Sequence, residues 1–204
     1  MTAATPTSIT ENKTVYLQDN SLWLQEGFLS EIEARLAYDS LMKQTCWEEA
    51  EISMFGRKVK IPRLQAFVGD PDIHYQYSGL SLTSAAWPTA ALHIREQLEQ
   101  QTGIRFNAAL LNLYRDGKDS MGWHKDDEKE LGDNPIIASV SLGGSRRFLL
   151  RNNRTGEKIE IPLHSGSLLW MQGELQTAWQ HSIPKTRSQV LPRINLTFRQ
   201  FKNY

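Results

Sequence analysis

Apolar residues recur at helical spacing in two stretches in the first half of the chain. In the first, Ser30 and Glu33 form a capping-box pattern, which predicts a helix over residues 30–43. The apolar residues expected on its buried face are Ile32, Leu36 and Leu41. The second predicted helix covers residues 88–101 and is followed by Gly103, a residue that favours a left-handed helix end. Its apolar face is made of Ala91, Leu92, Ile94 and Leu98.

Outside these helices the pattern changes to short alternating or apolar runs, which are typical of strands. In the first half, strands are expected over residues 14–17 and 47–53, a hairpin over 54–63 and a loop-rich segment over 68–86. In the second half, strands are expected over residues 105–115, 136–142, 147–152, 159–163, 167–171 and 193–201. This order predicts an α+β, mainly β fold: a sandwich or jelly roll with the two helices packed on one sheet.

Length and composition indicate one globular domain. The 204 residues, 40% hydrophobic and 23% charged, are enough to bury a substantial core. The net charge of zero neither favours nor opposes a nucleic-acid partner, but its distribution is uneven. Residues 1–51 carry 3 basic and 9 acidic side chains, whereas residues 144–204 carry 10 basic and 3 acidic ones. This asymmetry permits a basic face beside an acidic one, although taken alone it is better explained as solvated surface.

Cysteine usage and the lack of long apolar segments bear on the location of the protein. Cys46 is the single cysteine, so it forms no internal disulfide and fits a reducing compartment. Residues 1–14 lack the basic end and apolar core of a signal peptide, and no run of about 20 apolar residues occurs. We therefore expect a cytoplasmic protein (nuclear in a eukaryotic source) with no membrane partner, a disordered segment over residues 1–14 and, by default, a monomer.

The stretch from Asn112 to Asp126 carries the candidate chemistry. His124 and Asp126 are two residues apart, so in extended backbone their side chains point the same way. Such a pair, together with a distant histidine, is the ligand set of an Fe(II) facial triad, which leaves coordination positions open. The 57 residues between His124 and His181 would let three or four strands bring the chain back across a sandwich, which alone is weak evidence; together with the polar strand residues described next, it makes His181 the favoured third ligand. The histidines better explained by surface, packing or turn roles are His74, His93 and His164.

Two predicted strands carry polar residues on one face. On the last strand, Arg193, Asn195 and Arg199 share a face by alternation. A planar guanidinium suits a carboxylate, so a dicarboxylate co-substrate such as 2-oxoglutarate is a candidate ligand. Asn112 and Tyr114 share a face of an earlier strand and offer hydrogen-bond donors to the same ligand. A half-exposed edge strand and a polar outer face remain the alternative explanations.

Taken in order, these motifs resemble the AlkB family of Fe(II)/2-oxoglutarate-dependent dealkylating dioxygenases. The matching elements are Asn112-x-Tyr114, His124-x-Asp126, His181 and Arg193-x5-Arg199. The similarity is closest to the branch of animal nuclear AlkB homologues that repair alkylated DNA, and it extends roughly over residues 55–201. It implies one domain over residues 15–204, with a double-stranded β-helix (jelly roll) over 104–204. Residues from about 45 to 103 would form a nucleotide-recognition lid with a hairpin and a support helix.

The resemblance also implies roles for individual residues. His124, Asp126 and His181 would hold Fe(II), which works with the co-substrate 2-oxoglutarate and O2. Arg193 would bind the distal carboxylate of 2-oxoglutarate with help from Tyr114. The residues expected around the rest of the co-substrate are Asn112, Asn195 and Arg199.

For the substrate, the resemblance implies a finger-like hairpin that inserts Phe55 where the damaged base has left the stack. Cations on that hairpin, Lys58 and Lys60 among them, would meet phosphates. The full set of residues expected at the substrate is Phe55, Arg57, Arg63, Tyr75, Tyr77, Ser78, Asp127 and Glu128. Solvated loop carboxylates and plain core or loop tyrosines are the alternatives for the acidic and aromatic members of this set.

The implied function is oxidative demethylation of N-alkylated bases of the 1-methyladenine and 3-methylcytosine type in double- or single-stranded DNA. Formaldehyde, succinate and CO2 would be released. Two alternatives stay open: a dioxygenase of the same fold acting on RNA, protein or a small molecule, and a non-catalytic nucleic-acid-binding module. Zinc hydrolysis is disfavoured because the sequence has no His-Glu-x-x-His pair and no cysteine cluster.

Overall fold

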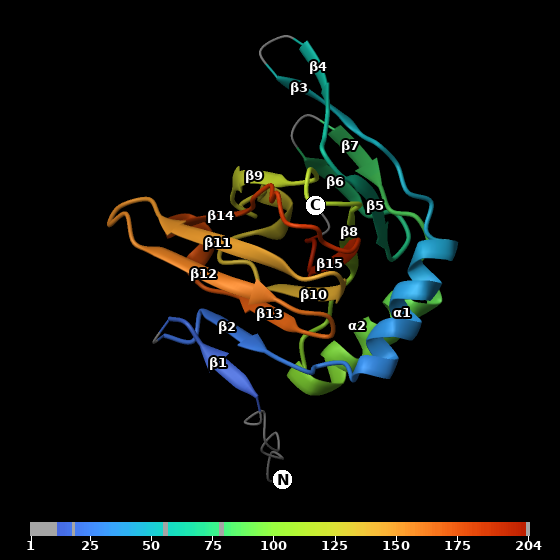
Figure 1. Ribbon diagram of the computed structural model, residues 1–204, viewed down its shortest axis with the longest axis horizontal. Coiled ribbons are helices and arrows are strands. Elements are labelled where there is room, and N and C mark those ends of the chain that lie inside the picture. The colour runs from blue at the N-terminus through green and yellow to red at the C-terminus, as the bar shows by residue number, and fades with distance from the viewer. Residues whose placement is uncertain (1–11, 18, 55–56, 78–79, 203–204) are drawn as a thin grey trace.

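The computed structural model describes residues 12–17, 19–54, 57–77 and 80–202. Two β-sheets face each other, and two long helices lie against the larger sheet (Figure 1). The larger sheet has the order β1 (Lys13–Val15), β2 (Leu22–Gln25), β13 (Leu168–Met171), β10 (Ile137–Gly143), β15 (Arg193–Arg199), β8 (Ala108–Tyr114) and β5 (Leu64–Gly69). The smaller sheet has the order β12 (Lys158–Leu163), β11 (Arg146–Asn152), β14 (Trp179–Ile183) and β9 (Met121–His124).

From β8 onward the chain passes back and forth between the two sheets, which is the winding of a jelly roll. The predicted mainly β fold with helices on one sheet is therefore confirmed. One apolar cluster fills the space between the sheets, and a second lies between the larger sheet and the helices. Among the described residues, no helix is both long enough and apolar enough to span a membrane.

The last described strand, β15, lies in the middle of the larger sheet, between β10 and β8. All seven of its residues are buried. Ile194, Leu196 and Phe198 belong to the cluster under the helices, whereas Asn195 and Arg199 line a cavity on the other face. The period of two in the sequence thus predicted the correct faces, because a strand covered on both sides still alternates its side chains.

The two long helices are α1 (Glu31–Gln44) and α2 (Thr89–Thr102). The predicted capping box is present: the Glu33 amide donates to Ser30 Oγ at 3.3 Å, and the Ser30 amide donates to Glu33 Oε2 at 2.8 Å. Gly103 ends α2 with φ 71°, the left-handed conformation expected there. The start of α1 and the end of α2 therefore follow from local capping chemistry.

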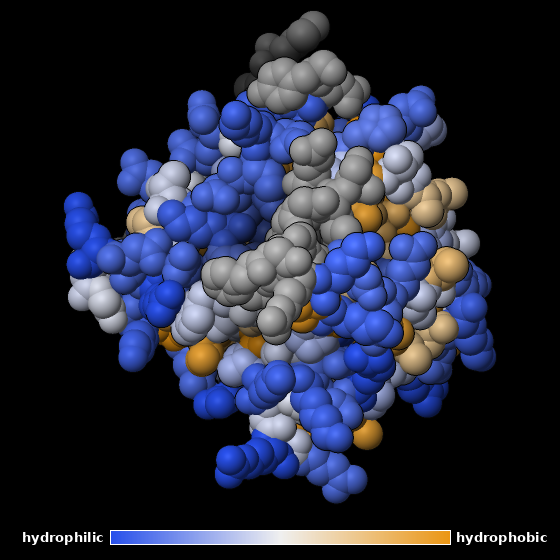
Figure 2. Space-filling model, turned by 90° about the horizontal axis from the view of Figure 1, so that it is seen from above, coloured by the Kyte–Doolittle hydropathy of each residue, from blue (hydrophilic) through white to orange (hydrophobic). Residues whose placement is uncertain are grey.

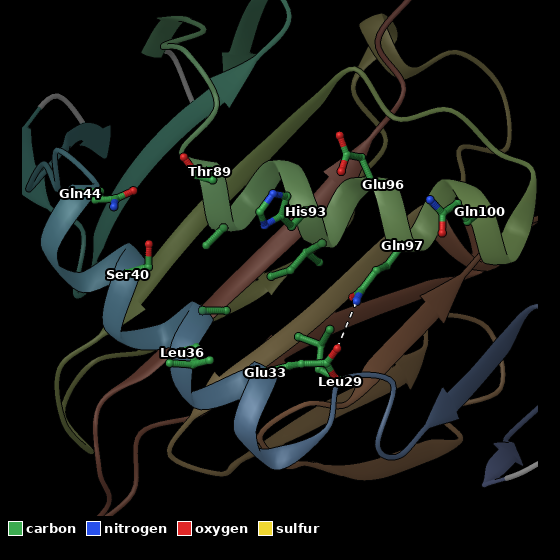
Figure 3. Close-up of a pocket in the computed structure, with 13 residues that line it drawn as sticks. Leu29, Glu33, Leu36, Ser40, Gln44, Thr89, His93, Glu96, Gln97 and Gln100 are labelled. Atoms are coloured by element: carbon green, nitrogen blue, oxygen red, sulfur yellow. Dashed lines mark hydrogen bonds between the residues drawn. The ribbon is translucent and has the colours of Figure 1, made fainter.

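The predicted buried face of α1 is wrong in two of its three residues. Leu41 is buried, but Ile32 and Leu36 are 66% and 60% exposed. The helix packs instead through the small residue Ala34, whose Cβ lies 3.6 Å from where a Cβ on Gly166 would be. A close approach at Ala34 turns the larger apolar residues outward. Leu36 borders a groove of about 560 Å³ between α1 and α2 (Figure 3).

The segment expected to be loop-rich, residues 68–86, contains strands. It holds the end of β5 and the hairpin of β6 (His74–Tyr77) and β7 (Leu80–Thr83), so this prediction is wrong. Gly69-Asp70-Pro71 marks the end of β5 and not a long loop. The hairpin expected over residues 54–63 is present, but its strands, β3 (Glu51–Met54) and β4 (Arg57–Lys60), begin three residues earlier and end at Lys60. The described residues on the face that carries the hairpins are mostly hydrophilic (Figure 2).

Two strands of the smaller sheet, β9 and β14, were not predicted. Each has four or five residues, β9 contains a glycine and β14 reads Trp-Gln-His-Ser-Ile. Short strands of this composition carry little periodic signal. Each of the two strands nevertheless contributes one of the predicted ligand histidines, His124 from β9 and His181 from β14.

Candidate metal and co-substrate site

Strands β9 and β14 bring together the three predicted metal ligands. The strands are antiparallel, and His181 is directly opposite His124. The ring centroids of the two imidazoles are 4.2 Å apart. The ligand atoms of His124, Asp126 and His181 all lie within 4.8 Å of one another. Within the described part of the chain, these residues form the one group of three or more His, Cys, Asp or Glu that meets this spacing.

A β-bulge immediately before His124 sets the direction of its ring. His181 pairs with His124 and Ile183 pairs with Met121, so two residues of β9, Gly122 and Trp123, oppose one residue of β14. His124 Nδ1 lies 2.9 Å from the Gly122 carbonyl oxygen, which can only accept. Nδ1 therefore carries the hydrogen, and Nε2 keeps its lone pair for a metal.

Asp126 is buried, and one of its carboxylate oxygens is occupied. Arg199 Nη2 donates to Oδ1 at 2.9 Å, while Oδ2 lies 3.9 Å from His181 Nε2. Burial alone would raise the pKa of this carboxyl, but Arg199, followed by His181 and His124, lowers it to about 2. The group is thus a carboxylate at neutral pH.

The two imidazoles are held in their neutral form. Burial, strengthened by the nearby His124, lowers the pKa of His181 to about 3, and burial also lowers the pKa of His124. Phe148 stacks against the His181 ring, with centroids 5.2 Å apart at 27°. Two neutral imidazoles and one carboxylate are the donor set of a 2-His-1-carboxylate iron site, so the residues present fit Fe(II).

Arg193, at the end of β15 opposite to Arg199, presents unsatisfied donors. The residue is 0% exposed, and its Nη2 donates to Ser141 Oγ at 2.9 Å. Its Nε and Nη1 are buried without a hydrogen-bond partner among the described residues. Burial lowers the pKa of Arg193 to about 10, although Tyr114, whose ring centroid is 5.4 Å from Cζ, favours the charged form. A buried cation with free donors is costly unless an anion completes it, so this position fits a carboxylate of 2-oxoglutarate.

One cavity between the sheets joins the metal group to four of the predicted co-substrate residues, whereas Arg193 is not part of its lining. Its polar lining includes Asn112, Tyr114, His124, Asp126, His181, Asn195 and Arg199. Its apolar lining consists of Leu110, Met121, Phe148, Met171 and Ile183. The polar groups face an interior otherwise lined by hydrocarbon, which strengthens each interaction made there.

Two of the expected co-substrate residues already have partners inside the protein. Asn195 Nδ2 donates to Ser139 Oγ at 2.9 Å and to the Val140 carbonyl at 3.2 Å. Asn112 Oδ1 accepts from Arg63 Nε at 2.8 Å. Both asparagines line the cavity, but the internal hydrogen bonds fix the orientation of their amides.

The expectation that Arg63 meets a phosphate does not fit its position. Its side chain is 3% exposed and donates to Asn112 and, more weakly, to the Ser120 carbonyl at 3.4 Å. It therefore ties the base of the β3–β4 hairpin to the cavity wall. Lys58 and Lys60 do lie on the exposed surface, where Lys60 pairs with Glu49 at 2.6 Å.

For Tyr75, expected at the substrate, the position in the structure fits the alternative of a core tyrosine. Tyr75 is 0% exposed and packs against Phe67 and Phe201 at centroid distances of 5.3 and 5.1 Å. Its hydroxyl donates to Glu128 Oε1 at 2.6 Å. Tyr75 is thus a core residue that holds Glu128 in place.

The acidic pair after the metal motif divides into one exposed and one half-buried residue. Asp127 is exposed. Glu128 is half-buried, its Oε2 has no hydrogen-bond partner among the described residues, and burial raises the pKa of its carboxyl against the attraction of Arg199. Phe55 and Ser78 lie outside the described residues, as do the side chains of Arg57 and Tyr77.

Sequence reasoning missed several residues that support the site. Ser139 and Ser141 on β10 bind Asn195 and Arg193, and Phe148 on β11 covers His181. The alternation of Ser139 and Ser141 within an apolar strand is a signal that could have revealed them. Nothing in the local pattern around Phe148 distinguishes it from a core residue.

Comparison with known proteins agrees with this geometry. The family model of the 2OG-Fe(II) oxygenase superfamily matches residues 21–199. The mouse protein named DNA oxidative demethylase ALKBH2 is 40% identical over 159 residues, covering 74% of this chain and 66% of the relative. The bovine protein named alpha-ketoglutarate-dependent dioxygenase alkB homolog 3 is 38% identical over 183 residues, covering 85% and 63%. The chain thus spans slightly less than two thirds of the length of these curated relatives.

A solved structure supports the fold independently. The structure of OsALKBH1 superposes with a TM-score of 0.62 at 17% sequence identity, covering 88% of this chain and 98% of that one. At this identity the likeness bears on the fold alone. It agrees with the two facing sheets of the jelly roll.

Proposed function

The chain belongs to the 2OG-Fe(II) oxygenase superfamily and, within it, to the AlkB family, and on this premise we propose that it oxidatively demethylates N-alkylated bases in DNA. The substrates would be bases of the 1-methyladenine and 3-methylcytosine type, and the products formaldehyde, succinate, CO2 and the unmodified base. The observation that carries the proposal is one cavity in which three metal-ligand side chains converge beside the buried guanidinium of Arg199. Arg193 lies at the other end of the same strand, with donors still unsatisfied.

Three side chains would hold the metal: His124 through Nε2, His181, and Asp126 through the oxygen that Arg199 does not bind. Three protein ligands leave positions open for other groups. When bound, Fe(II) with 2-oxoglutarate supplies the oxidising chemistry of O2, and the protein supplies binding and orientation. Arg199 keeps Asp126 ionised, and the hydrogen bond to Gly122 keeps the tautomer of His124 fixed.

Arg193 would bind the carboxylate of 2-oxoglutarate that lies farther from the metal. Its free Nε and Nη1 suit a contact with a carboxylate through more than one hydrogen bond. Ser141 holds the remaining nitrogen, so the guanidinium does not have to reorient on binding. Tyr114 lies against the guanidinium and limits the access of water to it.

Glu128 would face the target base. A methylated adenine or cytosine of this type carries a positive charge, and Glu128 Oε2 is a buried acceptor that lacks a partner among the described residues. A cationic base would provide that partner and would oppose the burial that raises the pKa of Glu128. Tyr75 holds the other oxygen, so the carboxyl group presents one atom to the base.

DNA is proposed as the substrate because relatives at about 40% identity are named DNA oxidative demethylases. We also propose that the protein acts as a monomer in the cytoplasm, or in the nucleus of a eukaryotic source. Strand preference is testable through the β3–β4 hairpin. Phe55→Ala should reduce activity on duplex more than on single strands, because an inserted aromatic ring offsets part of the cost of flipping a base. Equal losses on both substrates would remove the hairpin from the proposal.

The proposed function is tested by formaldehyde and succinate release from oligonucleotides carrying 1-methyladenine or 3-methylcytosine. Matched DNA and RNA strands, single and paired, are compared with and without Fe(II) and 2-oxoglutarate. Activity should require both additions and should vanish in His124→Ala, while His164→Ala, in an exposed turn, should keep it. Activity that persists without iron, or demethylation of RNA alone, would contradict the proposal.

A further inference from the structure

A four-residue helix, α3 (Leu175–Ala178), lies directly before β14 and next to the segment that carries Asp126. Its second residue, Gln176, is 1% exposed. The Gln176 side chain points into the protein and not to solvent: its Oε1 accepts from the backbone amide of Asp126 at 3.0 Å. Nothing in the sequence pattern had marked this residue as part of the site.

The backbone of Asp126 needs such a partner. The hydrogen-bonded pairing of β9 with β14 ends at the His124–His181 pair, and Asp126 lies two residues beyond it. A buried amide without a hydrogen-bond partner is destabilising. Gln176 therefore replaces the strand neighbour that the Asp126 amide would have had if the ladder continued.

Three atoms of Asp126 have distinct partners as a result. The amide is held by Gln176, Oδ1 is held by Arg199 at 2.9 Å, and Oδ2 remains on the side of His181 at 3.9 Å. Because the backbone amide and Oδ1 of Asp126 are both held by hydrogen bonds, the position of Oδ2 is determined as well. Without the backbone contact, the carboxylate could follow Arg199 away from the histidines.

We propose that Gln176 is a positioning residue for the metal site, acting through the Asp126 backbone. The inference rests on the proposed function, because it presumes that Asp126 binds a metal. Groups that orient metal ligands in this way typically change metal affinity by about 10–100-fold when they are lost. The same α3 also holds Lys125, whose Nζ donates to the Thr177 carbonyl at 2.7 Å on the exposed side.

The test measures Co(II) binding to the full-length protein, since Co(II) reports its ligand geometry through visible absorption bands. Gln176→Leu keeps a similar volume but removes the acceptor, so Co(II) affinity should fall by about 10–100-fold and the absorption bands should shift. Gln176→Asn keeps an amide that is one methylene too short to reach Asp126. It should lose affinity similarly and provides a second variant if the leucine protein does not fold.

The matched control is Gln172→Leu, in the segment between β13 and α3. Gln172 accepts from Trp170 Nε1 at 2.8 Å and touches none of the metal ligands. This control should lower the melting temperature while leaving Co(II) affinity and absorption bands unchanged. If folded Gln176→Leu or Gln176→Asn bound Co(II) with the affinity and absorption bands of the unmodified protein, the inference would be overturned while the proposed function would stand. Absence of Co(II) binding by the unmodified protein would overturn the proposed function together with the inference.

Discussion

Replacing Arg193 by methionine should weaken 2-oxoglutarate binding and, at the same time, stabilise the ligand-free protein. The weaker binding follows from the two donors, Nε and Nη1, that have no partner among the described residues. Hydrogen bonds to a charged group contribute about 1.5–3 kcal/mol each, so losing two removes about 3–6 kcal/mol. Because about 1.4 kcal/mol is a factor of ten, the KM for 2-oxoglutarate should rise by at least about 100-fold.

The stability change has the opposite sign because the guanidinium is wholly buried. A fall of its pKa from the ordinary 12.5 to about 10 corresponds to roughly 3 kcal/mol against the charged form in the folded state. The cost is present in full below pH 10, where both folded and unfolded states carry the charge. Losing the hydrogen bond to Ser141 subtracts about 1 kcal/mol, which leaves a net gain of about 2 kcal/mol, or roughly 4–8 °C in melting temperature.

The two effects are measured separately on the same protein. Succinate release at varied 2-oxoglutarate concentration gives the KM, and thermal unfolding without ligand gives the stability. Arg147→Met is the matched control, since Arg147 is exposed and pairs with Glu160 at 3.3 Å on the outer face of the smaller sheet. A folded Arg193→Met protein with a KM within about threefold of the unmodified value, a change worth well under 1 kcal/mol, would refute the reasoning.

Three further predictions concern pH, capping and the core. Burial lowers the pKa of His181 from 6.5 to about 3, so between these pH values the unfolded state takes up a proton that the folded state does not. The free energy of unfolding of the metal-free protein should therefore fall as the pH drops from 6.5 towards 3. His181→Gln should flatten this fall, measured by urea unfolding at several pH values, and an unchanged dependence on pH would contradict the assigned cause. Ser30→Ala removes the cap of α1 and should cost about 1 kcal/mol by urea unfolding, whereas Ser40→Ala inside the same helix should cost nothing. Tyr75→Phe leaves Glu128 Oε1 without its donor and should cost about 1–3 kcal/mol; a loss no larger than that of Tyr38→Phe would mean that the hydroxyl contributes nothing.

The residues that sequence reasoning placed correctly are those whose positions follow from local geometry. Asn112 and Tyr114 share a cavity wall because two residues make one period of a strand, and Arg199 lines the same cavity for the same reason. Arg193, on the same face of β15, is fully buried. The cap at Ser30 involves atoms three residues apart. In each case the neighbours along the chain are enough to determine the outcome.

The residues that were misplaced depend on contacts from distant parts of the chain. Ile32 is exposed because Ala34 allows α1 to approach the turn at Gly166, which the helix sequence alone does not reveal. Arg63 looked like a surface cation, but Asn112, 49 residues later, binds it in the interior. Tyr75 was assigned to the substrate, yet Glu128 and two phenylalanines enclose it. Local pattern cannot separate a buried polar residue with a remote partner from an exposed one.

The central position of β15 has a consequence for how the protein is made. This strand is the last of the described strands in chain order, and it pairs with β10 on one side and β8 on the other. During synthesis both neighbours emerge first, so each has an unpaired edge until residues 193–199 arrive. Chains that stop early would retain those two unpaired edges and would also lack Arg193 and Arg199. Shortening that removes β15 should therefore yield insoluble protein, and the site cannot assemble before this strand has been inserted.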